Sequence, residues 1–87
     1  MYVIVVYDVS EKRVAKMLKL CRRYFNWIQN SVFEGEISDV KLIEFKASAS
    51  HLMNSEEDSI IIFSSRQHRW LEKEIIGREK ASIENFL

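Results

Sequence analysis

An acidic residue, Asp8, directly follows an apolar run at the start of the chain. The run covers residues 2–7 and is rich in β-branched and aromatic side chains, which is typical of a buried strand. A carboxylate at the carboxyl end of a central strand lies at the rim of a sheet, where α/β folds often bind ligands. Carboxylate oxygen is also a ligand that Mg²⁺ prefers. Asp8 is therefore a candidate metal ligand. The alternative is that it only caps the following helix or ends the strand.

A homodimer would make Asp8 a better metal ligand. One carboxylate binds Mg²⁺ poorly, whereas two copies of Asp8 facing each other across a two-fold axis would bind it far better. Hydrolysis of a phosphodiester near neutral pH usually needs a metal that activates water and offsets charge on phosphate oxygens. We therefore expect metal chemistry at Asp8 only if the chain forms a homodimer.

Charge is unevenly distributed along the chain, although its 13 basic and 13 acidic residues give a net charge of zero. Six basic residues lie within residues 11–25 against one acidic residue, and seven acidic residues lie within 34–58 against two basic ones. A zero total argues against a protein that coats nucleic acid, but a local positive excess attracts phosphates. The alternative is a solvated helix face. The candidate phosphate-binding residues share one side of a predicted helix: Lys12, Lys16, Lys19 and Arg23, with Arg13 near its N-terminus.

Other catalytic and metal-binding patterns are absent from the sequence. It has no phosphate-binding glycine loop, no zinc-ligand spacing and no nucleophile elbow. His51 and His68 are expected on the surface and Cys21 in the core. The single cysteine excludes an intrachain disulfide and fits a reducing cytoplasm. No basic segment precedes the first apolar run, and Asp8 interrupts it, so we expect neither a signal peptide nor a membrane span.

Aromatic side chains on predicted strands are a second candidate contact with nucleic acid. On an open sheet face they stack on bases, but in most proteins they belong to the core. We expect Tyr2 and Phe63 in the core. The full set is Tyr2, Tyr7, Phe33, Phe63 and Trp70.

The first half of the chain predicts a strand, a helix and an extended segment. The strand covers residues 2–7, and the helix starts at an N-cap, Ser10, and fades around 24–26. Its apolar residues at helical spacing should face the sheet. Residues 27–37 alternate in polarity, as either one long strand or two short strands that meet near 30–31. The apolar helix residues are Val14, Met17, Leu18 and Cys21.

The second half predicts a helix over about 39–53, with Ser38 as its N-cap, and strands over 59–64 and 70–76. The apolar residues of 78–87 suggest an edge segment or a segment that docks onto a partner. The order of elements predicts a single α+β domain over residues 1–87, a ferredoxin-like βαββαβ sandwich with an extra C-terminal strand. Such a sheet has one bare face, and dimerisation is an obvious way for an 87-residue domain to cover it.

Several segments together resemble the CRISPR-associated Cas2 family. The most specific parts are the Tyr7-Asp8 end of the first strand and the Ser31-Val-Phe-Glu-Gly35 element. The resemblance covers essentially the whole chain, in order and at the right length. Its segments are Met1–Val9, the helix that contains Arg13, Ile28–Gly35, Glu57–Ile62 and Ile75–Gly77.

The resemblance implies a role in CRISPR antiviral defence. It implies a homodimer in which residues 78–87 of each chain extend onto the sheet of the other. The family is described as metal-dependent nucleases that act on single-stranded RNA or double-stranded DNA, and as partners of the spacer integrase during adaptation. By resemblance, Asp8 of each subunit would bind Mg²⁺, and four further residues would line or support that site: Tyr7, Arg13, Ser31 and Phe33.

The chain departs from the family pattern at two places, and other functions stay open. Ile61 or Ile62 stands where the family often has an arginine, and Trp27 lies near a position that is basic in some members. One alternative is a non-catalytic dimeric scaffold that bridges the spacer integrase and DNA. More distant alternatives are a toxin-type ribonuclease of similar fold and a regulatory dimer that binds a small molecule, although no ligand motif supports the latter.

Overall fold

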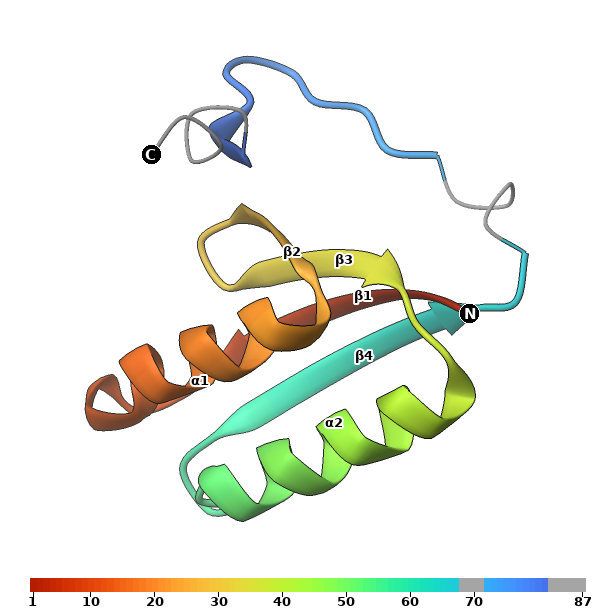
Figure 1. Cartoon of the computed structure of the whole chain (residues 1–87). Helices are drawn as coiled ribbons and strands as arrows, with labels where there is room; N and C mark the ends of the chain where they lie inside the picture. The colour runs from red at the N-terminus through yellow and green to blue at the C-terminus, as the bar shows by residue number, and fades with distance from the viewer. Residues whose placement is uncertain (68–71, 82–87) are drawn as a thin grey trace.

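The computed structural model describes residues 1–67 and 72–81 and contains one antiparallel sheet with two helices (Figure 1). The strand order is β2-β3-β1-β4, and each strand is antiparallel to its neighbours. This topology confirms the predicted ferredoxin-like sandwich. The elements in chain order are β1 (Tyr2–Asp8), α1 (Glu11–Tyr24), β2 (Asn26–Gln29), β3 (Val32–Glu36), α2 (Asp39–Leu52) and β4 (Ser59–Ser65).

Residues 27–37, which the sequence left as one strand or two, contain the turn of a hairpin. Strands β2 and β3 flank a two-residue turn, in which Asn30 has a φ of 44°. Asparagine tolerates this left-handed conformation better than most residues. The indole Nε1 of Trp27 donates a hydrogen bond to the carbonyl oxygen of Asn30 at 3.0 Å. The pairing is irregular between Trp27 and Gln29, so the hairpin twists at its closed end.

The core lies between the sheet and the two helices. Alternate residues of β1 (Val3, Val5 and Tyr7) point to the helices and are buried. Phe45 of α2 is fully buried, and its ring meets that of Phe25 edge-on at a centroid distance of 5.0 Å. Both helices therefore cover one face of the sheet, as Figure 1 shows.

The two helix starts use different acceptors. The Oγ atom of Ser38 accepts the backbone N–H of Lys41 at 3.1 Å, which confirms Ser38 as the N-cap of α2. Ser10 holds the N-cap position of α1, but its side chain makes no capping hydrogen bond. The prediction that Val14 faces the sheet is wrong, because it lies near the exposed start of α1 and is 40% exposed. Met17 and Cys21 are buried as expected.

The opposite face of the sheet has no helix over it and carries exposed apolar side chains. Phe63 is 55% exposed and Ile61 is 51% exposed. Register places them across from Ile4 and Val6 of β1, on the side away from the helices. We call this side of the sheet the open face. The prediction that Phe63 belongs to the core is therefore wrong, whereas Tyr2, on the same face, is 5% exposed.

Residues 72–75 lie over part of the open face. Together with Tyr2, Ile4 and Val32 they border a cleft of about 300 Å³. The Nζ atom of Lys73 donates to both carboxylate oxygens of Glu34 at 2.8 and 3.1 Å. Burial and a hydrogen bond with the Glu34 carboxylate raise the pKa of Tyr2 to about 12. This segment therefore contributes to the burial of Tyr2.

The C-terminal strand predicted over residues 70–76 does not form where the structure describes it. Residues 72–76 are irregular and exposed, because no strand within the described part of the chain pairs with them. Residues 70 and 71 lie outside the described residues, as do 82–87 of the predicted exchange segment. No helix in residues 1–67 and 72–81 is long and apolar enough to cross a membrane.

Truncation of the core aromatic residue of α2 tests this packing. We expect Phe45→Ala to lower the free energy of unfolding by about 3–5 kcal/mol, because it leaves a cavity beside Phe25. Ile43→Ala is the control, because Ile43 lies on the same helix and is 67% exposed. It should change stability by about 0.5 kcal/mol or less. Urea unfolding of the two variants checks this, and equal losses would contradict the described core.

Candidate functional site

Asp8 is the last residue of β1, and its side chain is exposed. Strand alternation places it on the open face, in line with Ile4 and Val6. Its Cα pairs with that of Ser59 in β4. The predicted position of Asp8 at the end of a central strand is thus confirmed, because β1 lies between β3 and β4.

A single chain does not build a metal site around Asp8. The described residues contain no group of three or more His, Cys, Asp or Glu side chains that could hold a metal ion. Asp8 fits Mg²⁺ by its chemistry, since it offers carboxylate oxygens at an exposed rim. Asp8 would need further ligands, which water, a second protein molecule or a nucleic acid would supply.

Tyr7, Ser31 and Phe33 lie together behind Asp8, on the helix side of the sheet. The backbone N–H of Tyr7 donates to the carbonyl oxygen of Ser31 at 3.1 Å. The rings of Tyr7 and Phe33 stack at a centroid distance of 6.2 Å, and both residues are buried. Neither ring is available to stack on a base in this chain. The two rings pack against the end of β1 from the core side and support it.

The phenol of Tyr7 is not poised for proton transfer near neutral pH. Burial raises its pKa above the ordinary value, and a hydrogen bond with Ser31 only partly opposes that shift. Burial also raises the pKa of the Cys21 thiol to about 12, so Cys21 is an inert core residue, as expected.

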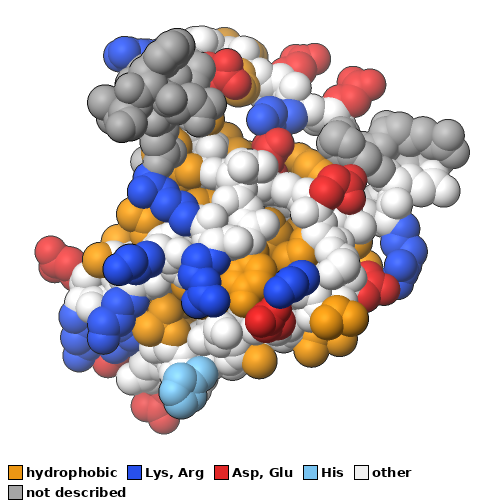
Figure 2. Space-filling model, in the orientation of Figure 1, with side chains coloured by type: hydrophobic (Ala, Val, Ile, Leu, Met, Phe, Trp, Pro, Cys, Tyr) orange, Lys and Arg blue, Asp and Glu red, His pale blue; other side chains and the backbone are white. Residues whose placement is uncertain are grey.

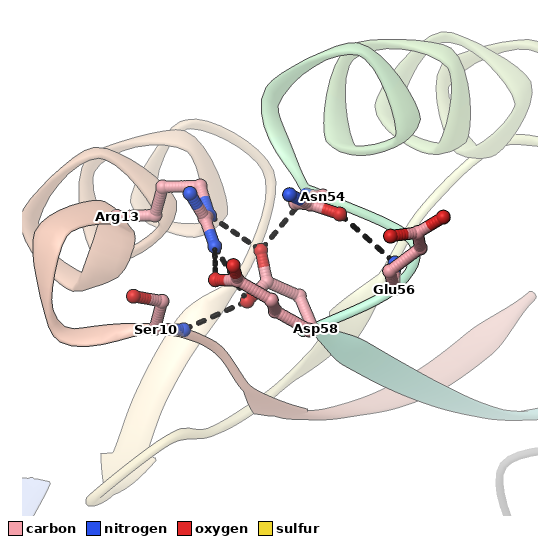
Figure 3. Close-up of polar contacts among 6 residues, drawn as sticks. Ser10, Arg13, Asn54, Glu56 and Asp58 are labelled. Atoms are coloured by element: carbon pink, nitrogen blue, oxygen red, sulfur yellow. Dashed lines mark hydrogen bonds and ion pairs between the residues drawn. The ribbon is translucent and has the colours of Figure 1, made fainter.

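Arg13 takes part in an ion-pair cluster rather than extending into solvent (Figure 3). Its guanidinium donates from Nε and one Nη atom to the carboxylate of Asp58, and from the same Nη atom to Glu57 at 2.7 Å. The Arg13 side chain is only 15% exposed. Its positive charge is thus already balanced by acidic side chains of the turn before β4.

Asp58 is the centre of this cluster. Its fully buried side chain also accepts the backbone N–H of Ser10 at 2.8 Å and that of Asn54 at 2.9 Å. Hydrogen bonding from Arg13 holds the pKa of Asp58 well below its usual range, and the two backbone N–H groups act in the same direction. We call Asp58 and Arg13, with the Ser10 and Asn54 amides, the Asp58 clamp. It joins the start of α1 to the turn between α2 and β4.

No role was predicted for Asp58, which counted only as one of the seven acidic residues within 34–58. Forty-five residues separate it from Arg13, so no local pattern links the two. The sequence did hold one signal that Asp58 has a partner, because this residue directly precedes an apolar strand. An acidic side chain that is buried at such a position needs a partner for its charge.

The basic residues predicted on α1 form an exposed surface. Figure 2 shows Lys and Arg side chains gathered over the region of α1. Arg13 does not belong to this surface, because Asp58 and Glu57 hold its guanidinium. The exposed members, which we call the basic face of α1, are Lys12, Lys16, Lys19 and Arg23.

A family model described as CRISPR associated protein Cas2 matches residues 1–73 of this chain. The chain belongs to the Cas2 family. A relative from Dictyoglomus turgidum is 45% identical over the full length of both chains, and one from Thermotoga maritima is 48% identical over 92% of each. Both relatives are called CRISPR-associated endoribonuclease Cas2. The family resemblance of the sequence is thereby confirmed.

Solved Cas2 structures share the fold. A crystal structure of Cas2 superposes with a TM-score of 0.85 at 41% identity and covers 93% of this chain and 91% of that one. Cas2 from Streptococcus pyogenes at pH 6.5 superposes with a TM-score of 0.71 at 30% identity, over 84% and 98% of the two chains. The ferredoxin-like sheet is thus the Cas2 architecture.

Neutralising Asp58 should destabilise the fold in a pH-dependent way. Its lowered pKa means that the clamp contributes fully above about pH 4, the ordinary carboxyl range, and loses its contribution as pH falls further. We expect Asp58→Asn to unfold several degrees lower than the parent at neutral pH, and the difference to shrink below about pH 4.

Thermal unfolding of both proteins across this pH range makes the measurement. Glu56→Gln, at an exposed position in the same turn, removes one charge outside the clamp and should melt like the parent at each pH. A difference between Asp58→Asn and the parent that does not vary with pH would contradict the ion pair.

Proposed function

We propose that this chain is a CRISPR adaptation subunit that binds nucleic acid as a homodimer and hydrolyses phosphodiester bonds with Mg²⁺ held by Asp8 of two subunits. The names of its relatives, CRISPR-associated endoribonucleases, favour a nuclease. The observation that carries the proposal is the exposed Asp8 carboxylate at the end of a central strand, beside an apolar face with no helix over it. Single-stranded RNA and double-stranded DNA are the substrate classes, and the cytoplasm is the compartment.

Three features of the described chain support a homodimer. The open face presents Ile61 and Phe63 to solvent, and apolar exposure of this kind marks interaction surfaces. Strand β4 is an edge of the sheet, so one side of its backbone is free to pair with another strand. Residues 72–75 border the open face, residues 72–76 pair with no strand of the described chain, and Ile76 is 98% exposed. A second copy of the chain would cover the open face, pair with the free edge of β4 and offer a strand partner to residues 72–76.

The proposed chemistry divides between the metal and the protein. Bound Mg²⁺ lowers the pKa of water and offsets charge on the phosphate. Asp8 of each chain supplies the carboxylate oxygens. Tyr7 and Phe33 hold the end of β1 from the core side, so the position of Asp8 is fixed before metal binding. The basic face of α1 binds phosphates of the backbone, which makes affinity depend on salt.

Replacing Asp8 tests the metal site. We expect Asp8→Asn to slow cleavage of RNA or DNA roughly 10²-fold or more, because losing metal ligation forfeits several kcal/mol of transition-state stabilisation. Removal of Mg²⁺ with EDTA should cause a similar loss in the parent. Rates on labelled single-stranded RNA and double-stranded DNA, with and without Mg²⁺, make the measurement.

Asp39→Asn is the matched control, because Asp39 is an exposed carboxylate at the start of α2. It should cleave like the parent. Cleavage that is unchanged in Asp8→Asn would show that another site, or a contaminating nuclease, carries the activity.

A charge on the open face tests the homodimer. We expect Phe63→Asp to raise the dimer dissociation constant roughly tenfold or more, because an unpaired carboxylate would be buried between the two sheets. Ile43→Asp, which adds the same charge to the exposed side of α2, should leave the dimer intact. Light scattering after gel filtration separates the two results. A monomeric parent protein would refute the proposal.

A non-catalytic scaffold that bridges DNA and the spacer integrase is the second candidate. The described residues contain no group of three or more candidate metal ligands and present a basic face with four exposed residues, and both observations favour it. In that case Asp8→Asn would acquire spacers normally, whereas charge reversal at Lys16, Lys19 or Arg23 would impair acquisition. A repeat array and an integrase gene beside the coding sequence would distinguish both roles from a toxin-type ribonuclease.

A further inference from the structure

The Asp58 clamp, drawn in Figure 3, joins the two segments of chain that border Asp8. Asp58 directly precedes Ser59, whose Cα pairs with that of Asp8. The same Asp58 carboxylate accepts the N–H of Ser10, two residues after Asp8. One buried carboxylate therefore fixes the strand across from Asp8 and the loop that follows it.

The hydrogen bonds of Arg13 fit a structural partner of Asp58 better than a ligand of phosphate. Arg13 donates to Asp58 from two nitrogen atoms and to Glu57 from one of them. Two carboxylates surround one guanidinium, so the cluster carries a net negative charge. A phosphate that approached Arg13 would meet this negative charge and a side chain that is 85% covered.

We propose that Asp58 and Arg13 are positioning residues for Asp8, which act by holding the loop between β1 and α1 against the start of β4. The inference rests on the proposed function of Asp8 as a metal ligand. The charge pattern predicted Arg13 as a phosphate-binding residue, and the family resemblance implied that it lines or supports the site. The inference assigns it to support of the metal-binding carboxylate alone.

The physical reason is the short connection between β1 and α1. Only Val9 and Ser10 separate Asp8 from the first residue of α1. Ser10 makes no side-chain cap, so the Asp58 carboxylate takes over the role of acceptor at this helix start. The Asp58 carboxylate accepts four hydrogen bonds, one of them from the loop itself, and so holds the loop in one conformation. Replacing a group that orients a metal ligand in this way commonly lowers metal affinity roughly 10- to 100-fold.

Metal binding can be measured without cleavage by using Mn²⁺ as the probe. In the full-length ¹⁵N-labelled dimer, Mn²⁺ should broaden the amide signals of residues near Asp8, and Asp8→Ala should abolish that effect. We expect Asp58→Asn to raise the Mn²⁺ concentration for half-maximal broadening roughly tenfold or more. Asp58→Glu keeps the charge and the pair with Arg13 but displaces the carboxylate by one methylene. Asp58→Glu should also raise the Mn²⁺ concentration for half-maximal broadening. It tests the proposal if Asp58→Asn fails to fold.

Glu57→Gln is the matched control, because Glu57 contacts Arg13 but not Ser10. It should leave the Mn²⁺ midpoint unchanged. Nucleic-acid binding in EDTA provides the second readout. Arg13→Gln should bind RNA and DNA like the parent if Arg13 is a positioning residue. If Arg13 contacts phosphate, Arg13→Gln should bind more weakly and reduce the salt dependence by about one unit of slope.

The outcomes separate the inference from the proposed function. Broadening by Mn²⁺ that persists in Asp8→Ala would refute Asp8 as the metal ligand, and with it the proposed function. Broadening that depends on Asp8 but has the parent midpoint in folded Asp58→Asn or Asp58→Glu would overturn only the positioning role. Weaker binding of nucleic acid by Arg13→Gln in EDTA would likewise overturn it.

Discussion

The alternation of side chains along β1 is the constraint on which the rest of the structure depends. Val3, Val5 and Tyr7 point to the helices and form the centre of the core. The residues between them, and Asp8 at the end, point to the open face. Because β1 pairs with a strand on each side, a slip by one residue would exchange the two faces and expose the core. The exposure of Asp8 is therefore a consequence of the same register that buries Val5.

The one-sided arrangement of the helices explains why several features of the chain are incomplete. Both helices lie on one face, so apolar side chains of β4 stay exposed on the other. Within the described residues, the outer edge of β4 has no neighbouring strand, and Asp8 belongs to no group of three or more side chains that could hold a metal ion. A two-fold symmetric partner would address all three, because symmetry supplies a second copy of every group. A domain this small also has a limited core of its own, so burial against a partner would contribute much of its stability.

Long-range ion pairing changes what the charge pattern means. Counted along the sequence, Arg13 adds to the positive excess of residues 11–25. In the folded chain its charge is balanced by Asp58 and Glu57, and its side chain is only 15% exposed. The remaining basic residues of α1 stay exposed. A count of charges therefore overestimates the basic face, since it contains no information about which charges are already paired.

The Cas2 family resemblance and the fold were both predictable from the sequence. The apolar run of β1, the helical spacing of Met17 and Cys21, and the N-cap at Ser38 are local patterns, and local patterns determine local structure. They also placed Asp8 at the end of a strand. The predicted pairing of Asp8 with its copy, and the roles of Tyr7, Ser31 and Phe33 at a metal site, remain predictions.

What only the tertiary structure decided depends on contacts between distant segments. Whether residues 27–37 formed one strand or two was settled by the conformation of Asn30 and the pairing of both halves. Phe63 is exposed because both helices pack on the other face, and residues 72–76 pair with no strand within the described part of the chain. The Asp58 clamp joins segments 45 residues apart. The sequence by itself determined the elements and the place of Asp8, whereas burial and charge pairing between distant residues arise only when the chain folds.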